Sequence, residues 1–261
     1  YGTLSFRATF KDIVKNIKAN QTAVNFIKSK IYSTVKNKKY ADILTNFDHP
    51  FTAKRPTLNT NYYEMFNKKN VELVDLKQSP IIKITKRGIK TNKGEYILDK
   101  IIFATGFDAL TGSILKLNII GKKGINLSKF WSKGPKSFLG LLVPNFPNLF
   151  IVSGPGSPSV LTNVPVQIEQ HVNWITNCIK YLEKNRKKSI ETTNLAAKKW
   201  QKEIMNSVKK TLFMKAKSSW YKGDNIPGKP KTFLPYPGGM PKYKSECIKV
   251  EKNKYKELKI S

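Results

Sequence analysis

An apolar stretch that ends abruptly on glycine does most to limit what this chain can fold into. It is DKIIFATGFDALTG, residues 99–112, in which residues 101–103 predict a buried strand and residues 104–106 end it with small side chains. A strand that stops at a tight glycine turn lets a nucleotide approach the backbone of a sheet protein. The usual companion, a G-x-G-x-x-G phosphate loop, does not occur in the 261 residues. The sequence therefore predicts one end of a dinucleotide site without the other.

The strong positive charge raises the question of a nucleic-acid partner. Lys and Arg number 48 against 17 Asp and Glu, a formal net charge of +31, and such an excess is typical of nucleic-acid or anionic-surface binding. Only 4 of the 48 are arginines, which specific phosphate and base recognition favours. The 44 lysines are spread along the chain and, with 22 asparagines, make up a quarter of it, as an A/T-rich genome would produce. We expect no nucleic acid, and keep a basic binding module as an alternative.

The apolar content favours a folded protein. Hydrophobic residues make up 39% of the chain, and no apolar run reaches the ~20 residues that a membrane span needs. Only Cys178 and Cys247 are present, too few for a disulfide scaffold or a cysteine metal cluster. We therefore expect no membrane span and a reducing, cytoplasmic location.

Apolar spacing and turn residues predict the order of elements. A first helix is expected within residues 10–38, with Asn20 or Thr22 as the candidate N-terminal cap. Two more helices are expected, over residues 163–185 and from Thr192 or Thr193 to about residue 212. The second helix would bury one stripe, which comprises Ile168, Val172, Ile175, Ile179 and Leu182. Strands are expected within residues 71–76, 80–91, 94–105, 137–143 and 148–154.

The remaining segments are expected to lack regular structure. Residues 47–60 form a loop, residues 62–67 a short helix or turn, and the tail from residue 219 is irregular. Aromatic packing must hold that tail, through Trp220, Tyr221, Phe233 and Tyr236. This order of helices and strands indicates an α/β fold.

The segment GPGSPSVLTN, residues 154–163, is a second place where a ligand could bind. Two glycines and two prolines fix the backbone between a strand and a helix. The helix N-terminus that follows has unpaired N–H groups and a partial positive charge. It suits a phosphate or the electron-rich oxygen of a reduced flavin ring. An ordinary strand-to-helix loop is the alternative interpretation.

The other chemically interesting residues say little by themselves. Lys54 and Arg55 lie in an otherwise neutral loop, where a cationic pair is usually solvated surface. His171 lies on the expected helix, where we expect it to be packed or hydrogen-bonded. The two histidines and two cysteines are too far apart for metal-ligand spacing, and no G-x-S-x-G nucleophile elbow is present.

Six blocks of the chain, taken in order, resemble the C-terminal half of Baeyer–Villiger monooxygenases, in particular the phenylacetone and cyclohexanone monooxygenase group. The blocks are FTAKRP, NYYEMFNKKNVELVDL, IIFATGFDALTG, GPKSFLGLLVPNFPNLFIVSGPGSPSVLTN, IEQHVNWI and SWYKGDNIPGKP. In that family the G-x-G-x-x-G strand lies near the N-terminus of the full-length enzyme, which accounts for the isolated strand end. Since the chain also opens on Tyr1, we expect a C-terminal fragment.

The resemblance implies the fold and its division. The fold would be α/β, the C-terminal part of a flavoprotein monooxygenase with two dinucleotide-binding domains and added helical segments. Residues 1–45 would be a helical segment of the NADP domain and residues 46–100 the end of the NADP-binding domain. Residues 101–261 would be the C-terminal half of the FAD-binding domain, without its N-terminal Rossmann half.

The resemblance also implies an activity that uses FAD and NADPH. NADPH would reduce the flavin, O₂ would add to give a peroxyflavin, and the peroxide anion would attack a small-molecule ketone to give an ester or lactone. Arg55 matches the family's active-site arginine, which would stabilise the peroxide anion and the charge on the carbonyl oxygen. Arginine suits this role because it does not give up its proton.

Further positions carry over from the family's motifs. Lys54 matches a contact to the 2′-phosphate of NADP, and Trp220 matches a tryptophan on a mobile loop that closes over the nicotinamide cofactor. Thr105, Gly106 and Asp108 match the segment that links the FAD and NADP domains.

The last set of positions surrounds the start of the helix. Ser159, Val160 and Leu161 match the substrate-side loop, and Asn163 and Val164 match the helix start near the flavin ring. At Val164 and the following proline the sequence departs from the family, where methionine and another apolar residue are frequent. Substrate preference is therefore not carried over.

Two alternatives to ketone oxygenation remain at this point. A flavin monooxygenase that oxidises N or S atoms of soft nucleophiles needs the protonated hydroperoxide, and Arg55 favours the ketone. A basic module that binds nucleic acid or an anionic surface would use the charge instead. Without a phosphate loop, we expect the fragment alone to hold FAD weakly and to be inactive; its oligomeric state stays open.

Overall fold

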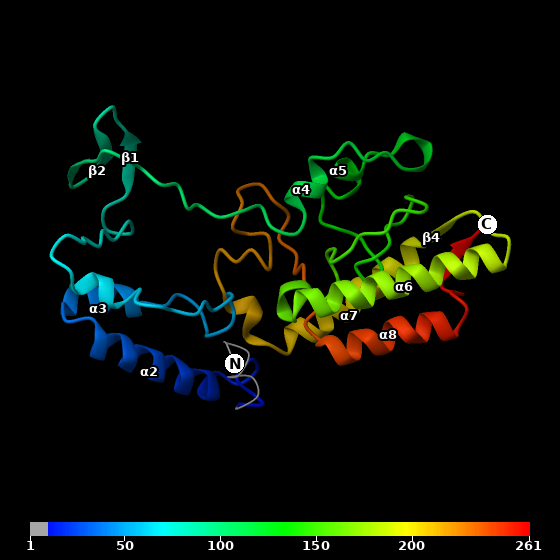
Figure 1. The fold of residues 1–261 in the computed structure, drawn as a ribbon, viewed down its shortest axis with the longest axis horizontal. Helices are drawn as coiled ribbons and strands as arrows, with labels where there is room; N and C mark the ends of the chain where they lie inside the picture. The colour runs from blue at the N-terminus through cyan, green and yellow to red at the C-terminus, as the bar shows by residue number, and fades with distance from the viewer. Residues whose placement is uncertain (1–9) are drawn as a thin grey trace. The chain divides into compact units, whose positions relative to one another are not determined.

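The computed structural model describes residues 10–261, which divide into two compact units. Unit 1 is Tyr1–Gly106 and unit 2 is Phe107–Ser261. Figure 1 shows the course of the chain through both, and each unit is described by itself.

The described part of unit 1 has two helices, of which the first is shorter than the helix expected over residues 10–38 and the second begins at the end of that range. They are α2 (Ile17–Thr34) and α3 (Lys38–Thr45). The chain breaks between them at Asn37, whose side chain accepts a hydrogen bond from the backbone N–H of Tyr40 at 3.3 Å and so begins α3.

The expected start of the first helix, at Asn20 or Thr22, is wrong. The cap is Asn16, whose side chain accepts from the N–H of Lys18 at 2.9 Å. Asn20 is buried instead, with 1% of its surface exposed. Its amide donates to the carbonyl oxygens of Ile13 (2.8 Å) and Phe51 (3.0 Å) and accepts from the N–H of Phe51 at 2.9 Å. A buried amide therefore fastens the 47–60 loop to α2.

The core of unit 1 forms where these helices meet a short 3₁₀ helix, η1 (Glu64–Asn67), as expected near residues 62–67. Its buried residues are Ile31, Val35, Ala41 and Phe66.

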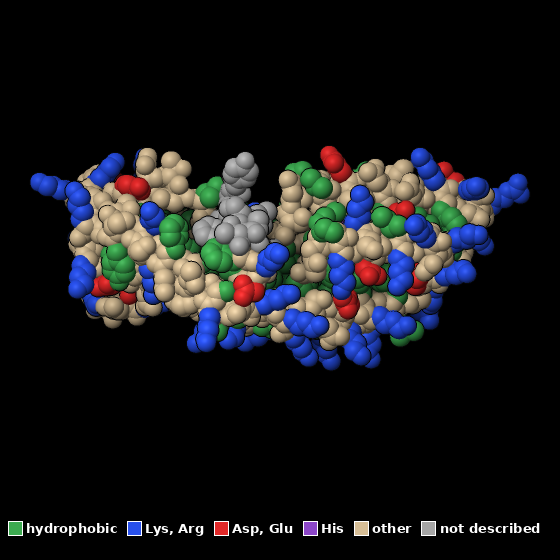
Figure 2. Space-filling view, turned by 90° about the horizontal axis from the view of Figure 1, so that it is seen from below, with side chains coloured by type: hydrophobic (Ala, Val, Ile, Leu, Met, Phe, Trp, Pro, Cys, Tyr) green, Lys and Arg blue, Asp and Glu red, His purple; other side chains and the backbone are tan. Residues whose placement is uncertain are grey.

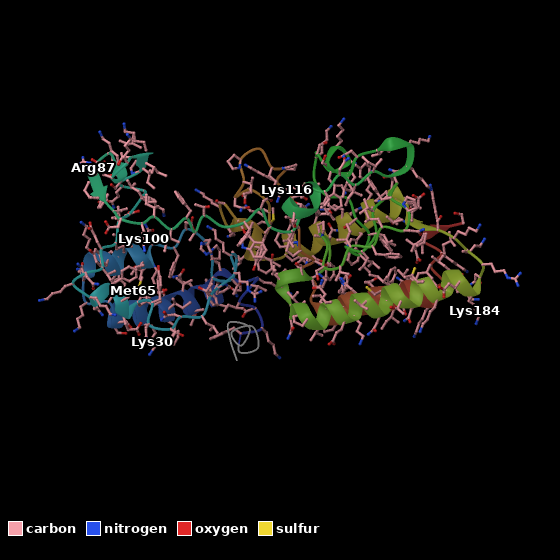
Figure 3. All side chains as sticks on the ribbon, turned by 45° about the horizontal axis from the view of Figure 1, so that its top comes forward. Lys30, Met65, Arg87, Lys100, Lys116 and Lys184 are labelled. Atoms are coloured by element: carbon pink, nitrogen blue, oxygen red, sulfur yellow. The ribbon has the colours of Figure 1, made fainter. Side chains whose placement is uncertain are left out.

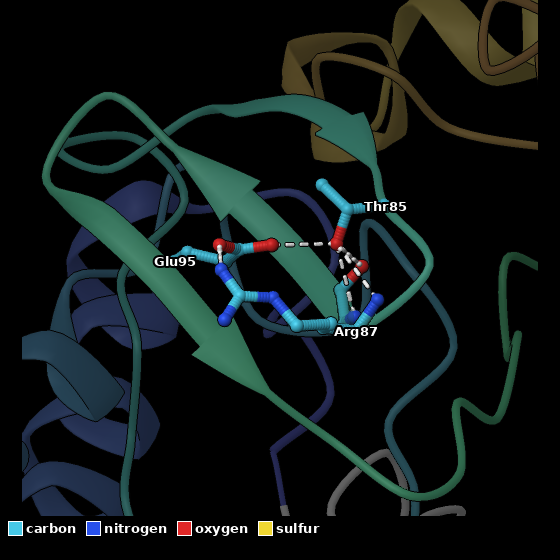
Figure 4. Close-up of polar contacts among 4 residues, drawn as sticks. Thr85, Arg87 and Glu95 are labelled. Atoms are coloured by element: carbon cyan, nitrogen blue, oxygen red, sulfur yellow. Dashed lines mark hydrogen bonds and ion pairs between the residues drawn. The ribbon is translucent and has the colours of Figure 1, made fainter.

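A three-stranded antiparallel sheet follows, in the order β1 (Ile81–Ile84), β2 (Gly88–Thr91) and β3 (Gly94–Ile97). The turn between β1 and β2 is held by the contacts in Figure 4, where Thr85 Oγ1 donates to Glu95 Oε1 at 2.7 Å and Arg87 Nη2 pairs with Glu95 Oε2 at 2.8 Å. The hydrogen bond from Thr85 lowers the pKa of Glu95, and Arg87 adds to this effect.

Two expected strands of unit 1 are absent from the described residues. Residues 71–76 and 101–105 are irregular, and Ile102 and Phe103 are 90% and 67% exposed. A strand requires a hydrogen-bonded neighbour, and the described part of the chain provides none here. The prediction of a buried strand at 101–103 is therefore wrong for this structure.

Unit 2 is built around three helices. Helices α6 (Val164–Lys184), α7 (Asn194–Lys209) and α8 (Met240–Lys252) run beside one another (Figure 1). Strands β4 (Ile190–Thr192) and β5 (Leu258–Ile260) form an antiparallel pair. The shorter elements are α4 (Gly112–Leu115), η2 (Lys122–Gly124), α5 (Leu127–Phe130), η3 (Ser159–Leu161) and η4 (Leu212–Lys215).

The structure confirms the existence of two of the expected helices in this unit. Helix α6 lies within residues 163–185, and α7 is capped by Thr193, whose Oγ1 accepts from the N–H of Ala196 at 3.0 Å. The irregular stretch after residue 219 is also confirmed, with Tyr221, Phe233 and Tyr236 at most 2% exposed. Helix α8 was not expected, although its buried residues Tyr243, Cys247 and Val250 have helical spacing.

The stripe expected to be buried on α6 is largely on the surface. Ile168, Val172 and Ile179 are 38%, 48% and 43% exposed. The buried face comprises Gln167, His171, Trp174, Cys178 and Leu182. Polar residues lie on it because their side chains bond to an interior loop, which an apolar pattern cannot reveal.

The strands expected at residues 137–143 and 148–154 are reduced to isolated contacts. Within the described range, Leu142 makes antiparallel bridges with Phe138 and with Phe150, without a continuous strand. These residues nevertheless lie in the core, since Leu141 and Leu142 are fully buried.

The positive charge is scattered over the surface. On the face in Figure 2, Lys and Arg side chains occur along the molecule and are interspersed with acidic and hydrophobic ones. Figure 3 labels Lys30, Lys116 and Lys184 at separate places along the chain. No continuous basic strip is seen on that face of the described part. Among these residues, no helix has both the length and the apolar character needed to cross a bilayer.

Candidate functional site

The cationic pair Lys54 and Arg55 lies in the loop that Asn20 anchors. Ala53, directly before the pair, is fully buried, and its N–H bonds the carbonyl oxygen of Pro50 at 3.0 Å. The backbone is thus fixed up to the point where the two cations emerge, Lys54 half-buried and Arg55 exposed.

Asp48 controls the position of Lys54. Its Oδ1 lies 2.6 Å from His49 Nδ1 and 3.5 Å from Lys54 Nζ. The hydrogen bond from His49, and then the charge of Lys54, lower the pKa of Asp48. The Asp48 carboxylate thus lies near Lys54, which is followed by an exposed arginine, and the two cations can bind an anion such as a phosphate.

The segment that carries Trp220 is a loop folded on itself within unit 2. Asp224 Oδ1 accepts from the N–H of Ser219 at 2.6 Å, and its Oδ2 lies 2.9 Å from Lys222 Nζ. Both charged side chains are nearly buried, at 13% and 12% exposure. The half-buried Trp220 packs edge-on against Tyr221, with ring centroids 4.7 Å apart.

An ion pair fastens this loop to the segment after Gly106. Lys229 Nζ pairs with Asp108 Oδ1 and lies 3.2 Å from the carbonyl oxygen of Ala109, and only 11% of the Lys229 side chain is exposed. The loop that carries one expected site residue, Trp220, is thereby paired with another, Asp108, through Lys229. Sequence reasoning did not identify Lys229, because nothing distinguishes it from the other 43 lysines.

Asp108→Asn is expected to loosen the Trp220 loop. The amide keeps the shape of the carboxylate but removes the charge that pairs with Lys229, so cleavage of the loop by trypsin should accelerate several-fold. Glu203→Gln, which breaks the exposed pair with Lys242, is the matched control and should leave the rate unchanged. Equal cleavage rates in both variants would contradict a tethering role for Asp108.

Thr105 and Gly106 lie at the exposed end of unit 1. Gly106 has φ +88°, and a Cβ there would meet nothing within 4 Å. Conformation rather than space therefore calls for glycine at this position.

The glycines of the 154–163 segment serve internal packing and do not form a phosphate cradle. A Cβ on Gly154 would lie 2.5 Å from the carbonyl oxygen of Gly140, and one on Gly156 would lie 2.7 Å from Ser137 Oγ. The space a phosphate would need beside these glycines is occupied by the protein itself. The binding of a phosphate or a flavin oxygen at the helix start that follows stays a prediction.

The start of α6 remains available to a ligand. Asn163 is exposed and its side chain caps no N–H, and Pro165 occupies the first turn. The first amides of a long helix are thus left without a side-chain partner, at its positive end. Val164, Val160 and Leu161 are half-buried next to it.

Ser159, shortly before the start of α6, has a strained backbone conformation. It is 3% exposed and has φ +47°, a left-handed conformation unusual for serine. It begins η3, so the residues expected on the substrate side form one short 3₁₀ turn before the helix.

His171 holds this loop from within, as its expected packed position suggested. Its Nδ1 accepts from the N–H of Ser153 at 3.0 Å, so Nε2 carries the proton and donates to Tyr243 Oη at 2.8 Å. Tyr243 in turn donates to the carbonyl oxygen of Leu139 at 2.6 Å. Burial lowers the pKa of His171 to about 4. A second ring proton, on Nδ1, would face the N–H of Ser153.

Stability is expected to fall with acidity because of His171. A pKa of about 4 in the folded chain against 6.5 in the unfolded one means that the unfolded state binds the proton first. The contribution of His171 to the free energy of unfolding is fully present above pH 6.5 and decreases by about 3 kcal/mol toward pH 4. Urea unfolding followed by tryptophan fluorescence, at several pH values, should show this decline in the natural chain and much less of it in His171→Gln. An equal decline in both would contradict it.

The described residues do not support catalysis by a cysteine nucleophile or by a bound metal ion. Burial raises the pKa of both Cys178 and Cys247 to about 12, so neither is a nucleophile. No group of three or more His, Cys, Asp or Glu side chains in this part of the chain could hold a metal ion.

A cavity of about 460 Å³ lies in unit 1, between the residue 72–76 segment and the sheet. Its lining is mostly apolar and comprises Glu72, Val74, Leu76, Ile81, Ile89, Thr91, Tyr96 and Leu98. None of the expected site residues is among them.

Known proteins similar to this chain are flavin-dependent monooxygenases, although no protein-family model matches it. Cyclohexanone 1,2-monooxygenase from Acinetobacter sp. is 42% identical over 253 residues, which is 97% of this chain and 46% of that enzyme. Phenazine N-monooxygenase from Lysobacter antibioticus is 39% identical over 93% of the chain and 44% of its own length. A crystal structure described as OTEMO complexed with FAD and NADP superposes with a TM-score of 0.92 at 36% identity, over 97% of this chain and 46% of that one.

The fold and these relatives define the class as flavoprotein monooxygenases. Within that class the chain resembles Baeyer–Villiger monooxygenases, along the half of them that it matches. It spans about half the length of the relatives it matches, in accord with the expected C-terminal half.

Proposed function

We propose that this chain supplies one half of an FAD- and NADPH-dependent monooxygenase that inserts oxygen next to a ketone carbonyl. The observation that carries the proposal is the match to cyclohexanone 1,2-monooxygenase along 97% of the chain. In this proposal residues 1–45 and 46–100 belong to the NADP domain and residues 101–261 to the FAD domain. A cytoplasmic location is part of it, because both cysteines are free thiols.

The residues present are suited to both cofactors. The uncapped start of α6, at Asn163 and Val164, offers amides to the electron-rich edge of a flavin ring. The fixed pair of Lys54 and Arg55 offers cations to an NADP phosphate. Reduced by NADPH, bound FAD supplies the activation of O₂.

The chain's own residues would then orient and stabilise the reacting groups. Arg55, which cannot lose its proton, would stabilise negative charge on the substrate's carbonyl oxygen. Lys54, held by Asp48, would bind the 2′-phosphate of NADP. Ser159, Val160 and Leu161 would border the ketone.

Loops of unit 2 would also contribute to cofactor binding. Trp220 would cover the nicotinamide and exclude water, on a loop whose position depends on the pair between Asp108 and Lys229. Thr105, Gly106 and Asp108 would connect the two cofactor domains.

Oxidation of a nitrogen or sulfur atom is the second candidate. The similarity to phenazine N-monooxygenase favours it, at 39% identity. Arg55 favours the ketone instead, because a permanent cation stabilises the anionic oxidant that a ketone requires.

A chimera tests the proposal. The half of the Acinetobacter cyclohexanone 1,2-monooxygenase that this chain does not match would be fused ahead of the chain and supplied with FAD, NADPH and either cyclohexanone or methyl phenyl sulfide. We expect a stoichiometric flavoprotein that forms the lactone. Sulfoxide without lactone would establish the second candidate, and a folded chimera that binds no flavin would overturn the proposal.

A further inference from the structure

Gln167 lies near the start of α6 and is fully buried, although its side chain is polar. Its Nε2 donates a hydrogen bond to Ser157 Oγ at 2.9 Å and lies 3.5 Å from Ser153 Oγ. Ser157 is also fully buried, and its Oγ donates in turn to the carbonyl oxygen of Gly154 at 2.7 Å. The backbone N–H of Gln167 bonds the carbonyl oxygen of Asn163 at 3.1 Å. One residue thus holds both the loop before α6 and the residue that precedes the helix.

The short helix η3 lies between these two attachment points. The side chain of Gln167 holds Ser157, its backbone holds Asn163, and Ser159–Leu161 is the segment between them. Ser159 has the left-handed φ of +47°, a conformation that persists only where the surrounding structure enforces it. Because the Gln167 amide fixes the near end of this segment, its removal should release η3.

Stability does not account for a glutamine at this position. Its Oε1 is buried and has no hydrogen-bond partner among the described residues, and a buried acceptor without a partner destabilises a fold. A methionine has a similar volume and leaves no such acceptor, so it would fill the same space at lower cost. What the glutamine adds is the hydrogen bond to Ser157.

We propose that Gln167 is a positioning residue that fixes η3 relative to the first amides of α6 and so controls how tightly the proposed site binds its ketone. It would act through Ser157, without touching the ketone. The inference rests on the proposed function, in which η3 borders the ketone and the start of α6 lies at the flavin ring. The hydrogen bonds that hold η3 do not depend on that function.

Gln167→Met and Gln170→Met form a matched pair of variants. Gln170 is a half-buried residue of the same helix, and its Oε1 is likewise without a partner in the described part of the chain. Its side chain interacts with Cys247 of α8 instead of with the loop. Both variants should melt close to the natural chain, because each removes an unpaired buried acceptor.

Hydrogen exchange in the chain alone reports on η3. The N–H groups of Leu161 and Thr162 make hydrogen bonds within this turn, of 3.0 and 3.2 Å. Gln167→Met should accelerate their exchange about 10-fold without a change in the core of unit 2, whereas Gln170→Met should leave it unchanged. Ser157→Ala removes the other end of the same bond, so it should accelerate these amides too, and adding it to Gln167→Met should have little further effect.

Kinetics of the chimera separate positioning from a loss of structure. Gln167→Met should raise the KM for cyclohexanone about 10-fold, because a turn that is formed part of the time binds the ketone in proportion to its formed fraction. The KM for NADPH and the kcat of NADPH oxidation should stay within about 2-fold, since flavin reduction does not involve η3.

Equal exchange of the two amides in both glutamine variants would overturn the proposal. It would also be overturned by faster exchange throughout unit 2, which would make Gln167 a purely structural residue, or by an unchanged KM for cyclohexanone. Faster exchange confined to η3, with no lactone formed even by the unsubstituted chimera, would keep the hold of Gln167 on η3 and remove the proposed function.

Discussion

Arg55→Ala in the chimera is expected to abolish lactone formation while NADPH oxidation continues. Arg55 is an exposed residue, and the neighbouring Lys54 lies 3.5 Å from Asp48. If the Arg55 guanidinium stabilises the negative charge on the substrate's carbonyl oxygen, its removal should lower the rate of lactone formation about 10²–10³-fold, as the loss of one oxyanion-hole donor does. Reduction of the flavin does not need that charge, so oxygen consumption should persist and yield hydrogen peroxide.

Arg87→Ala is the control for this prediction. Arg87 is also an exposed arginine of unit 1, but it pairs with Glu95 at the sheet turn, 2.8 Å away, outside the candidate site. Lactone formation by this variant should stay within a factor of two. Full ester formation by Arg55→Ala, or an equal loss in both variants, would remove the role assigned to Arg55.

Gly140→Ala is expected to destabilise unit 2 by about 3 kcal/mol or more. Gly140 has φ +69°, which costs an alanine roughly 1–2 kcal/mol. Its Cβ would also lie 2.4 Å from the backbone nitrogen of Ser157, and neither backbone can yield without moving the loop before α6. Such overpacking adds about 1–3 kcal/mol.

Gly124→Ala separates the two costs. Gly124 has nearly the same conformation, φ +71°, but a Cβ there would meet nothing within 4 Å. We expect it to lose about 1 kcal/mol. Both values can be read from urea unfolding monitored by tryptophan fluorescence, which reports on unit 2 alone because Trp131, Trp174, Trp200 and Trp220 all lie there. Similar losses in the two variants would show that the contact with Ser157 is not restrictive.

Helices were more predictable from the sequence than the faces they bury. The spacing in residues 163–185 indicated α6 correctly, but its buried side includes Gln167 and His171, which bond within the protein. Apolar periodicity cannot identify such residues, because their burial depends on partners distant in the sequence. Of the five apolar residues that it did identify, Leu182 is buried, whereas Ile168, Val172 and Ile179 are partly exposed.

Strands depended on neighbours that the sequence does not specify. The hairpin turns at residues 85–88 and 91–94 are local, and the sheet they connect was predicted. Residues 101–103 have equal strand character but no partner in the described range, and they remain irregular.

The site residues were accessible in different degrees. Arg55 had no local signal in a neutral loop, and only the resemblance to a family drew attention to it. Lys229 had no local signal either, and although it lies in the block SWYKGDNIPGKP, its pairing with Asp108 joins positions 121 residues apart. The start of α6 could be expected from residues 154–163, whereas the packing function of its glycines required the structure.

The most direct measurement is the fate of oxygen in the chimera. Cyclohexanone would be incubated with NADPH under ¹⁸O₂, and the product analysed by mass spectrometry. We expect one ¹⁸O atom in the ring of each lactone molecule, formed at the expense of one NADPH. Unchanged cyclohexanone, with all of the oxygen recovered as hydrogen peroxide from a fully flavinated chimera, would contradict the assignment of this chain to ketone oxygenation.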